Sequence, residues 1–257
     1  MILPNLSPYA PPMRIYTDLA NWYPLLTPRV DYKDEAVVYQ RIMRSKLGQG
    51  PLSLLELGCG AGHNASYFTD FDLTLTDLSA DMLQLAQLNC AGTNNGQGAR
   101  CIQGDMRSLR LGRTFDAVLL HDAVDYMVTQ TDLAACFATA FVHLRPHGCL
   151  LVTPDVVAET FTPTTYHEGV DGDGRALRYL EWSWQAAGQS ECYTVDYTMV
   201  MRTGDAEPVI VNDRHVVGMF SRSTWLRLLA QAGFTQVACE TGDAELPTMF
   251  LACKGPG

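Results

Sequence analysis

Hydrophobic and polar positions follow one pattern between residues 52 and 153. Short apolar runs alternate there with longer amphipathic stretches, which is typical of parallel strands joined by helical crossovers. The predicted strands are Ser53–Leu57, Asp72–Thr76, Arg100–Gln103, Phe115–Leu120 and Cys149–Thr153. The predicted helices are Ala61–Phe68, Ser79–Asn89 and Asp132–His143. The pattern therefore predicts an open α/β sheet.

The pattern changes after Pro154. Large apolar side chains then occupy alternate positions of one segment, namely Tyr193, Val195, Tyr197, Met199 and Met201. Such alternation indicates a strand with one buried face, and Leu177–Gln185 and Glu207–Val217 are predicted as its antiparallel neighbours.

The α/β pattern resumes near residue 221, with a predicted helix at Ser223–Ala232 and a strand at Met249–Cys253. We therefore predict three parts. They are an N-terminal helical lid (1–50), an α/β domain (51–154 and 221–257) and an antiparallel β insertion (155–220).

Composition narrows the class of partner. The 257 residues carry a net charge of −10 and no Lys/Arg cluster, which disfavours nucleic acid and anionic membranes as partners. The longest charge-free helical stretch, Leu133–Leu144, falls well short of the roughly 20 residues of a membrane span. Met1–Pro4 lacks the features of a signal peptide, so a cytoplasmic location is expected. The eight cysteines form no C-x-x-C pair, which favours buried reduced thiols over a metal site.

The most informative motif joins the first predicted strand to the next helix. Gly58, Gly60 and Gly62 alternate there, and glycines let a backbone bend sharply and present its amides to a ligand at a helix start. His63 occupies the position of the third glycine in a dinucleotide-binding motif, which disfavours a nicotinamide cofactor.

Two further loops are expected at the same edge of the sheet. Asp77 ends the second strand, where a carboxylate can accept hydrogen bonds from both hydroxyls of a ribose, and Gly104–Asp105 follows the third strand. Because ligands of open α/β sheets bind at the carboxyl ends of the strands, the spacing predicts a crevice that fits a nucleoside.

These residues resemble the first motif, E/D-x-G-x-G-x-G, of class I S-adenosylmethionine-dependent methyltransferases, in the style of the small-molecule aminosugar and glycine N-methyltransferases. The resemblance covers residues 52–153 and the helix and strand after 222. It implies a Rossmann-like, doubly wound seven-stranded sheet whose antiparallel last strand is Met249–Cys253.

The resemblance also implies a set of residues that bind S-adenosylmethionine. Glu56 would support the glycine turn, Asp77 would hold the ribose, Leu78 and Met106 would flank the adenine, and Asp105 would face its amine. The aromatic-rich first fifty residues include Tyr9, Trp22, Tyr32 and Tyr39, and one of their tyrosines would close over the cofactor; ring packing within a helix is the alternative. The remaining members of the expected set are Tyr16, Tyr23, Gly58, Cys59, Gly60, Gly62, Met82, Gly104 and His121.

The loop after the fourth strand is expected to border the methyl acceptor. His121 and Tyr126 are the candidate catalytic residues, because either could receive a proton from the acceptor. A sulfonium methyl group is already activated, however, so an unprotonated amine requires chiefly alignment and exclusion of water. Whether the acceptor atom is nitrogen or oxygen, and whether a base is used, stays open.

Mixed aromatic and charged residues in the insertion suit the roof of an acceptor pocket. The candidates are Arg178, Trp182, Tyr197 and His215. The insertion could equally form the interface of a homodimer, and its charged residues could be a solvated strand face.

The function predicted is methyl transfer to a nitrogen or oxygen of a small molecule by direct displacement. The alternative is a non-catalytic regulatory module that binds an adenosyl nucleoside. An oxidoreductase is disfavoured by His63, and a nucleic-acid methylase by the charge and by His121–Val124, which replaces the usual Asn/Asp-Pro-Pro-Tyr/Phe element.

Overall fold

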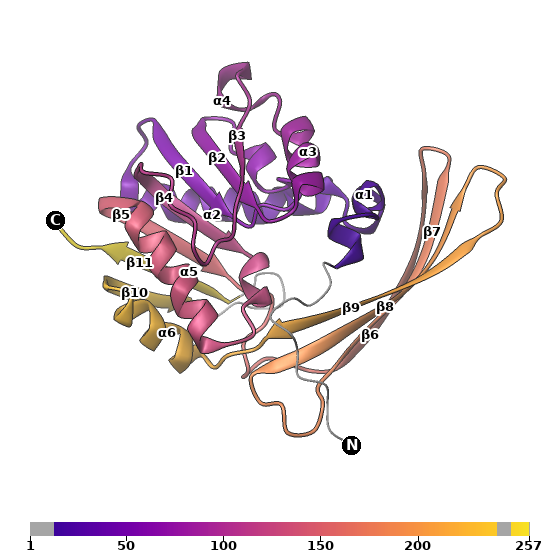
Figure 1. Cartoon of the computed structure of the whole chain (residues 1–257). Coiled ribbons are helices and arrows are strands. Elements are labelled where there is room, and N and C mark those ends of the chain that lie inside the picture. Colours follow the sequence, from indigo (N-terminus) through magenta and orange to yellow (C-terminus); the bar gives the residue numbers. More distant parts are fainter. Residues whose placement is uncertain (1–12, 241–247, 257) are drawn as a thin grey trace.

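The computed structural model describes residues 13–240 and 248–256, and its main body is a seven-stranded sheet with helices on both faces (Figure 1). In spatial order the strands are β10 (Phe234–Glu240), β11 (Met249–Lys254), β5 (Leu144–Thr153), β4 (Phe115–His121), β1 (Leu52–Leu57), β2 (Phe71–Asp77) and β3 (Arg100–Gln103). The strands from β5 to β3 are parallel, and β11 is antiparallel to β5 and to β10. The prediction of a doubly wound sheet with an antiparallel last strand is confirmed.

The apolar residues of each central strand supply two separate cores. In β1, Leu55 and Leu57 pack with α5 (Gln130–His143) and α6 (Arg222–Gln231), whereas Leu52 and Leu54 pack with α2 (Lys33–Leu47) and α3 (Ala80–Asn89). All seven residues of β4 are buried. A strand covered on both faces carries an almost continuous apolar run, which is the pattern seen in the sequence.

A four-stranded antiparallel sheet projects from this body (Figure 1). It contains β6 (Thr164–Gly172), β7 (Arg175–Trp184), β8 (Cys192–Thr203) and β9 (Val209–Gly218), in that order. The predicted inner face of β8 is confirmed, since Tyr193, Val195, Met199 and Met201 are buried.

The N-terminal segment, residues 13–32, packs against the inner face of this second sheet. It contains the 3₁₀ turns η1 (Arg14–Tyr16), η2 (Ala20–Trp22) and η3 (Arg29–Tyr32) and the short helix α1 (Tyr23–Leu26). Ile15, Leu19 and Leu25 form one core with Leu177 and Met199 of the insertion. The segment therefore lies between the α/β body and the second sheet. Tyr9, named above, lies outside the described residues.

Three details differ from the prediction. The helix expected at Ala61–Phe68 is wrong, because Gly60 and Gly62 both have positive φ and leave only the 3₁₀ turn η4 (Ala65–Tyr67). Strands β6 and β10 were not predicted, because both are edge strands with mostly exposed residues and neither carries a continuous apolar run. In the described ranges no helix is long and apolar enough to cross a membrane.

Candidate active site

The glycine turn sits at the carboxyl end of β1, beside the point where the strand order reverses between β1 and β4. Gly58, Gly60 and Gly62 have φ values of 76°, 51° and 69°, a region that favours glycine. A Cβ on Gly58 would lie 2.5 Å from the Cβ of Ala123, so only glycine allows the loop after β4 to approach. A Cβ on Gly60 would make only ordinary van der Waals contacts, with Met82 at 3.7 Å and with the hydroxyl of Tyr23 at 4.0 Å.

Asp77 is fixed by the turn that it faces. Its two carboxylate oxygens accept hydrogen bonds from the backbone amides of Gly60 and Ser79, each at 2.8 Å. Burial raises the pKa of Asp77, and the same amide hydrogen bonds oppose that shift. A carboxylate oriented in this way keeps lone pairs available for two ribose hydroxyls.

The residues expected to surround the adenine directly follow β2 and β3. Leu78 is 67% exposed although it is apolar, and Met106 contacts the place that a Gly58 Cβ would occupy. Asp105 follows Gly104 and is paired with Arg107 at 2.6 Å, which lowers the pKa of its carboxyl group. Met82 and Cys59 are buried beneath the turn and provide its packing.

Tyrosines of the N-terminal segment lie over the glycine turn. The hydroxyl of Tyr23 is 4.0 Å from the Cβ position of Gly60, and its ring stacks on His63 at 5.4 Å between centroids. The carbonyl of Tyr16 accepts a hydrogen bond from the hydroxyl of Ser79, two residues beyond Asp77. Both tyrosines therefore lie beside the turn where the cofactor is expected.

Tyr16 also connects this turn to the insertion. Its hydroxyl is 2.7 Å from the hydroxyl of Tyr126, which is 2.9 Å from Nδ1 of His215. His215 packs against the ring of Tyr197 at 5.1 Å between centroids and contacts Asp213. Burial raises the pKa of Tyr126 well above its usual value, so this residue is a neutral hydroxyl rather than a ready phenolate base.

His121 ends β4 with both ring nitrogens engaged. Nε2 is 3.0 Å from Asp122 and 3.2 Å from Glu35, and Nδ1 is 3.3 Å from the amide nitrogen of Asn64. Burial alone would lower the pKa of His121, but the adjacent Glu35 outweighs it and the pKa is raised. A histidine held in this way is suited to positioning its neighbours rather than to accepting a proton.

A cavity of about 320 Å³ adjoins His121. Its lining residues are Thr27, Asp31, Tyr32, Glu35, His121, Asp122 and Asp155. Asp122 has a φ of 42°, which is strained for a residue with a side chain, and such strain is concentrated at active sites. Glu56 is buried nearby, and burial raises its pKa to about 8.

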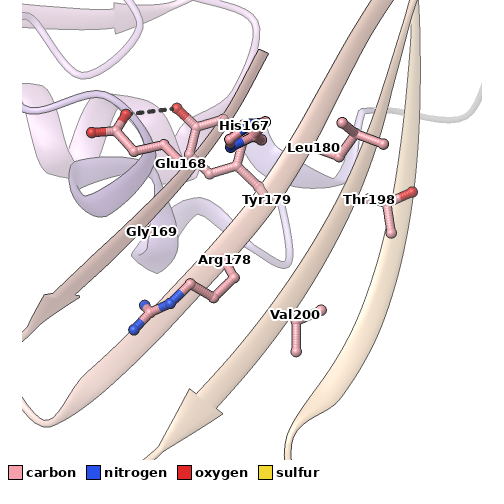
Figure 2. Close-up of a pocket in the computed structure, with 8 residues that line it drawn as sticks. All are labelled: His167, Glu168, Gly169, Arg178, Tyr179, Leu180, Thr198 and Val200. Atoms are coloured by element: carbon pink, nitrogen blue, oxygen red, sulfur yellow. Dashed lines mark hydrogen bonds between the residues drawn. The ribbon is translucent and has the colours of Figure 1, made fainter. Parts of the chain in front are cut away.

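The four candidate acceptor residues of the insertion lie on two different faces of the second sheet. Tyr197 and His215 lie on the inner face with Tyr16 and Tyr126. Arg178 and Trp182 lie on the outer face, where Arg178 pairs with Asp171 and Trp182 is 50% exposed. Arg178 lines a separate hollow of about 660 Å³ on the second sheet. Figure 2 shows the eight residues that line this hollow. These two residues are not brought to the cavity, because alternate positions of a strand point to opposite faces.

Sequence reasoning missed several polar residues around His121. They are Asp31, Glu35, Asn64, Asp122 and Asp155. Only Asp122 had a local signal, its place directly after a buried strand. In the described part of the chain, no group of three or more His, Cys, Asp or Glu side chains is arranged to hold a metal ion.

Comparisons with known proteins agree with this geometry. Residues 54–148 match a family model described as a methyltransferase domain. The dTDP-3-amino-3,4,6-trideoxy-alpha-D-glucopyranose N,N-dimethyltransferase of Streptomyces venezuelae is 37% identical over 218 residues, which cover 83% of this chain and 88% of that protein.

Two solved structures are similar along most of the chain. DesVI from Streptomyces venezuelae is 27% identical with a TM-score of 0.79, and the match covers 94% of this chain and 99% of DesVI. The S-adenosylmethionine-bound CalS10, an amino pentose methyltransferase from Micromonospora echinaspora, is 26% identical with a TM-score of 0.73 and coverages of 87% and 91%.

The cofactor prediction fits the residues present, since a Cβ on Gly60 would meet no atom closer than 3.7 Å and Asp77 presents its carboxylate beside the turn. Neither the site nor the relatives support the alternative of a regulatory module. The chain belongs to the class I S-adenosylmethionine-dependent methyltransferases.

Proposed function

We propose that this enzyme methylates the amino group of a nucleotide-linked amino sugar, and that it does so twice. The observation that carries the proposal is the position of the acid-lined cavity at the end of β4, next to the glycine turn and beneath the N-terminal segment. The relative from Streptomyces venezuelae, named for N,N-dimethylation of a dTDP-linked amino sugar, supports this acceptor class.

Residues of the glycine turn would bind the cofactor. Gly58, Gly60 and Gly62 would receive its methionine part, Asp77 its ribose, and Leu78 and Met106 its adenine. When bound, S-adenosylmethionine supplies a methyl group activated by a sulfonium centre. The remaining assignments within this proposal are Cys59, Met82 and Gly104 as support for the turn, Glu56 beneath it, and Asp105 near the adenine amine.

The chain would promote transfer mainly by alignment. Tyr16 and Tyr23 would cover the reacting groups and exclude water, while Tyr126, Tyr197 and His215 form the wall on the insertion side. His121 would hold Glu35 and Asp122 in place and would not act as the base. Holding two reactants in line supplies a large part of the rate acceleration of such reactions.

The direct test incubates the protein with S-adenosylmethionine and a dTDP-linked 3-amino sugar and follows the products by mass spectrometry. We expect the monomethylated and then the dimethylated sugar. The matched control is the same nucleotide with a hydroxyl in place of the amine, which should remain unmethylated. Methylation of the hydroxyl compound, or of neither compound, would refute the acceptor assignment.

The other expectations concern partners and location. We propose a homodimer formed by the outer face of the second sheet, where Leu180 and Trp182 are 42% and 50% exposed. Trp182→Glu should then lower the sedimentation coefficient from that of a dimer to that of a monomer.

The net charge of −10 supports the absence of nucleic acid as a partner. All eight cysteines are free, which supports a cytoplasmic location.

A further inference from the structure

A closed hydrogen-bond network joins the N-terminal segment, the loop after β4 and strand β9. The hydroxyl of Tyr16 is 2.7 Å from the hydroxyl of Tyr126, which is 2.9 Å from Nδ1 of His215. Nε2 of His215 is 3.3 Å from Oδ2 of Asp213, and the same oxygen accepts the backbone amide of Ile15 at 3.0 Å. Because Ile15 and Tyr16 are adjacent in the chain, the network begins and ends on the N-terminal segment.

The β9 end of this network is shielded from water. His215 is 3% exposed, and the side chain of Asp213 is 8% exposed. Burial alone would raise the pKa of Asp213, but the hydrogen bonds from His215 and from the amide of Ile15 outweigh it, and the pKa is lowered. Asp213 is therefore an ionised carboxylate, which accepts hydrogen bonds and donates none.

The ionised carboxylate fixes the direction of each hydrogen bond in the network. Because Asp213 only accepts, Nε2 of His215 carries the hydrogen, and Nδ1 of the neutral imidazole is an acceptor. Tyr126 then donates its hydrogen to Nδ1, and its oxygen accepts the hydrogen of Tyr16. A tyrosine hydroxyl has one hydrogen and two lone pairs, so the oxygen of Tyr16 keeps its acceptor capacity for another group.

Tyr16 is the member of the network that lies beside the glycine turn. Its backbone carbonyl accepts a hydrogen bond from the hydroxyl of Ser79, and its ring packs with Met82 and lies 5.9 Å from the ring of Tyr23. The other end of the network belongs to β9 of the second sheet. The network therefore connects the second sheet to the glycine turn through the N-terminal segment.

We propose that Asp213 and His215 are positioning residues for methyl transfer. Through the hydroxyl of Tyr126 they hold Tyr16 with its oxygen as a hydrogen-bond acceptor toward the reacting groups. The inference rests on the proposed function, in which Tyr16 covers those groups. An amine that awaits methylation carries N–H donors, and an acceptor oxygen fixed beside it orients the nitrogen lone pair toward the methyl group.

Histidine NMR tests the direction of the network without a measurement of activity. In isotope-labelled protein the signals of the two ring nitrogens report which of them carries hydrogen. We expect Nε2–H and an unprotonated Nδ1 for His215 at about pH 8.5, where an ordinary histidine is neutral. The loss of the signal in His215→Phe assigns it. An Nδ1–H tautomer or a doubly protonated imidazole in the wild type would overturn the proposal.

Kinetics of two variants test whether the β9 residues act through Tyr126. Tyr126→Phe and His215→Phe should each lower kcat for the amino acceptor roughly tenfold, the effect of one lost hydrogen bond. KM and the affinity for S-adenosylhomocysteine should stay within about twofold of wild type. The double variant should be within about twofold of either single variant, because both changes interrupt the same chain of contacts. Losses that multiply to roughly 100-fold would show independent roles and refute the inference.

A conservative replacement separates positioning from packing. The amide oxygen of asparagine can replace Nδ1 as the acceptor for Tyr126, so His215→Asn should recover kcat to within about threefold of wild type. His167→Phe is the matched control, because His167 is an exposed histidine of the same sheet, on β6. The control should match wild type, and all variants should melt cooperatively. Equal losses in His215→Asn and His215→Phe would assign a packing role and contradict the proposal.

These measurements also separate the inference from the proposed function. If the NMR signal shows Nε2–H but the wild type forms no methylated amino sugar, the proposed function fails and the positioning of Tyr16 stands. If the amino sugar is methylated but the losses of the two variants multiply, the inference fails alone.

Discussion

At the residue scale, the proposed contact of Asp77 with the ribose can be tested directly. Asp77→Ala should weaken S-adenosylhomocysteine binding by about 1.5–3 kcal/mol, the loss of a charge-assisted contact, without unfolding the protein. Asp72→Ala on the same strand is the control, because its carboxylate is exposed and pairs with Arg113. Isothermal titration calorimetry measures both variants, and equal affinities would contradict the assignment of the ribose site.

His121 tests whether the reaction needs a base at this position. His121→Asn should keep methylation of an amine within about tenfold of wild type, because general base catalysis, typically worth at least 10²-fold, is not what the imidazole supplies here. Steady-state kinetics with the amino acceptor gives the answer. A loss of a thousandfold or more, with cofactor affinity retained, would make His121 the base.

Single residues differed in how far they could be predicted. Asp77 and the three glycines stand in a local motif whose geometry follows from the strand–turn–helix order, so their positions were predictable. Glu35 and Asn64 are 29 positions apart, and Asn64 and His121 are 57 apart. Contacts of this kind depend on how elements pack, and no local pattern in one sequence records them.

At the element scale, the glycine turn should tolerate no side chain at its first glycine. Gly58→Ala adds a Cβ at 2.5 Å from Ala123 as well as backbone strain at a φ of 76°. Gly112→Ala is the matched control, because its φ is 67° and nothing lies within 4 Å. Thermal unfolding should show Gly58→Ala less stable than Gly112→Ala by about 1–3 kcal/mol. Equal stabilities would show that the close approach of the loop after β4 is unimportant.

Elements were predictable where a hydrophobic period was strong. The central strands were predicted because both of their faces are apolar. Helices α3, α5 and α6 were predicted because each carries one regular apolar stripe. The helix at 61–68 was wrong because left-handed glycines override the helical pattern. Edge strands β6 and β10 were missed because their stability comes from a neighbouring strand rather than from their own side chains.

At the scale of the whole molecule, buried carboxyl groups link stability to pH. Burial raises the pKa of Glu56 from 4.5 to about 8 and also raises the pKa values of Asp122 and Asp125. A carboxyl group with a raised pKa in the folded state stabilises fully below its unfolded pKa, and this contribution is lost as pH rises through the folded pKa. The melting temperature should therefore fall between pH 4.5 and about 8, and the fall should be smaller in Glu56→Gln. An identical pH dependence in wild type and variant would contradict the burial of an uncompensated Glu56.

Residues of the two sheets and of the N-terminal segment contact one another near the glycine turn. The α/β sheet supplies the glycine turn, Asp77 and His121, the segment supplies Tyr16 and Tyr23, and the second sheet supplies Tyr197 and His215. The sequence predicted each part separately. The contacts between these parts became visible only in three dimensions.

A crystal structure with S-adenosylhomocysteine and a dTDP-linked amino sugar would test the proposed site most directly. We expect cofactor density along Gly58–Gly62, with the ribose on Asp77 and the sugar amine in the cavity beside His121. Cofactor density elsewhere, or a sugar amine turned away from that cavity, would contradict it.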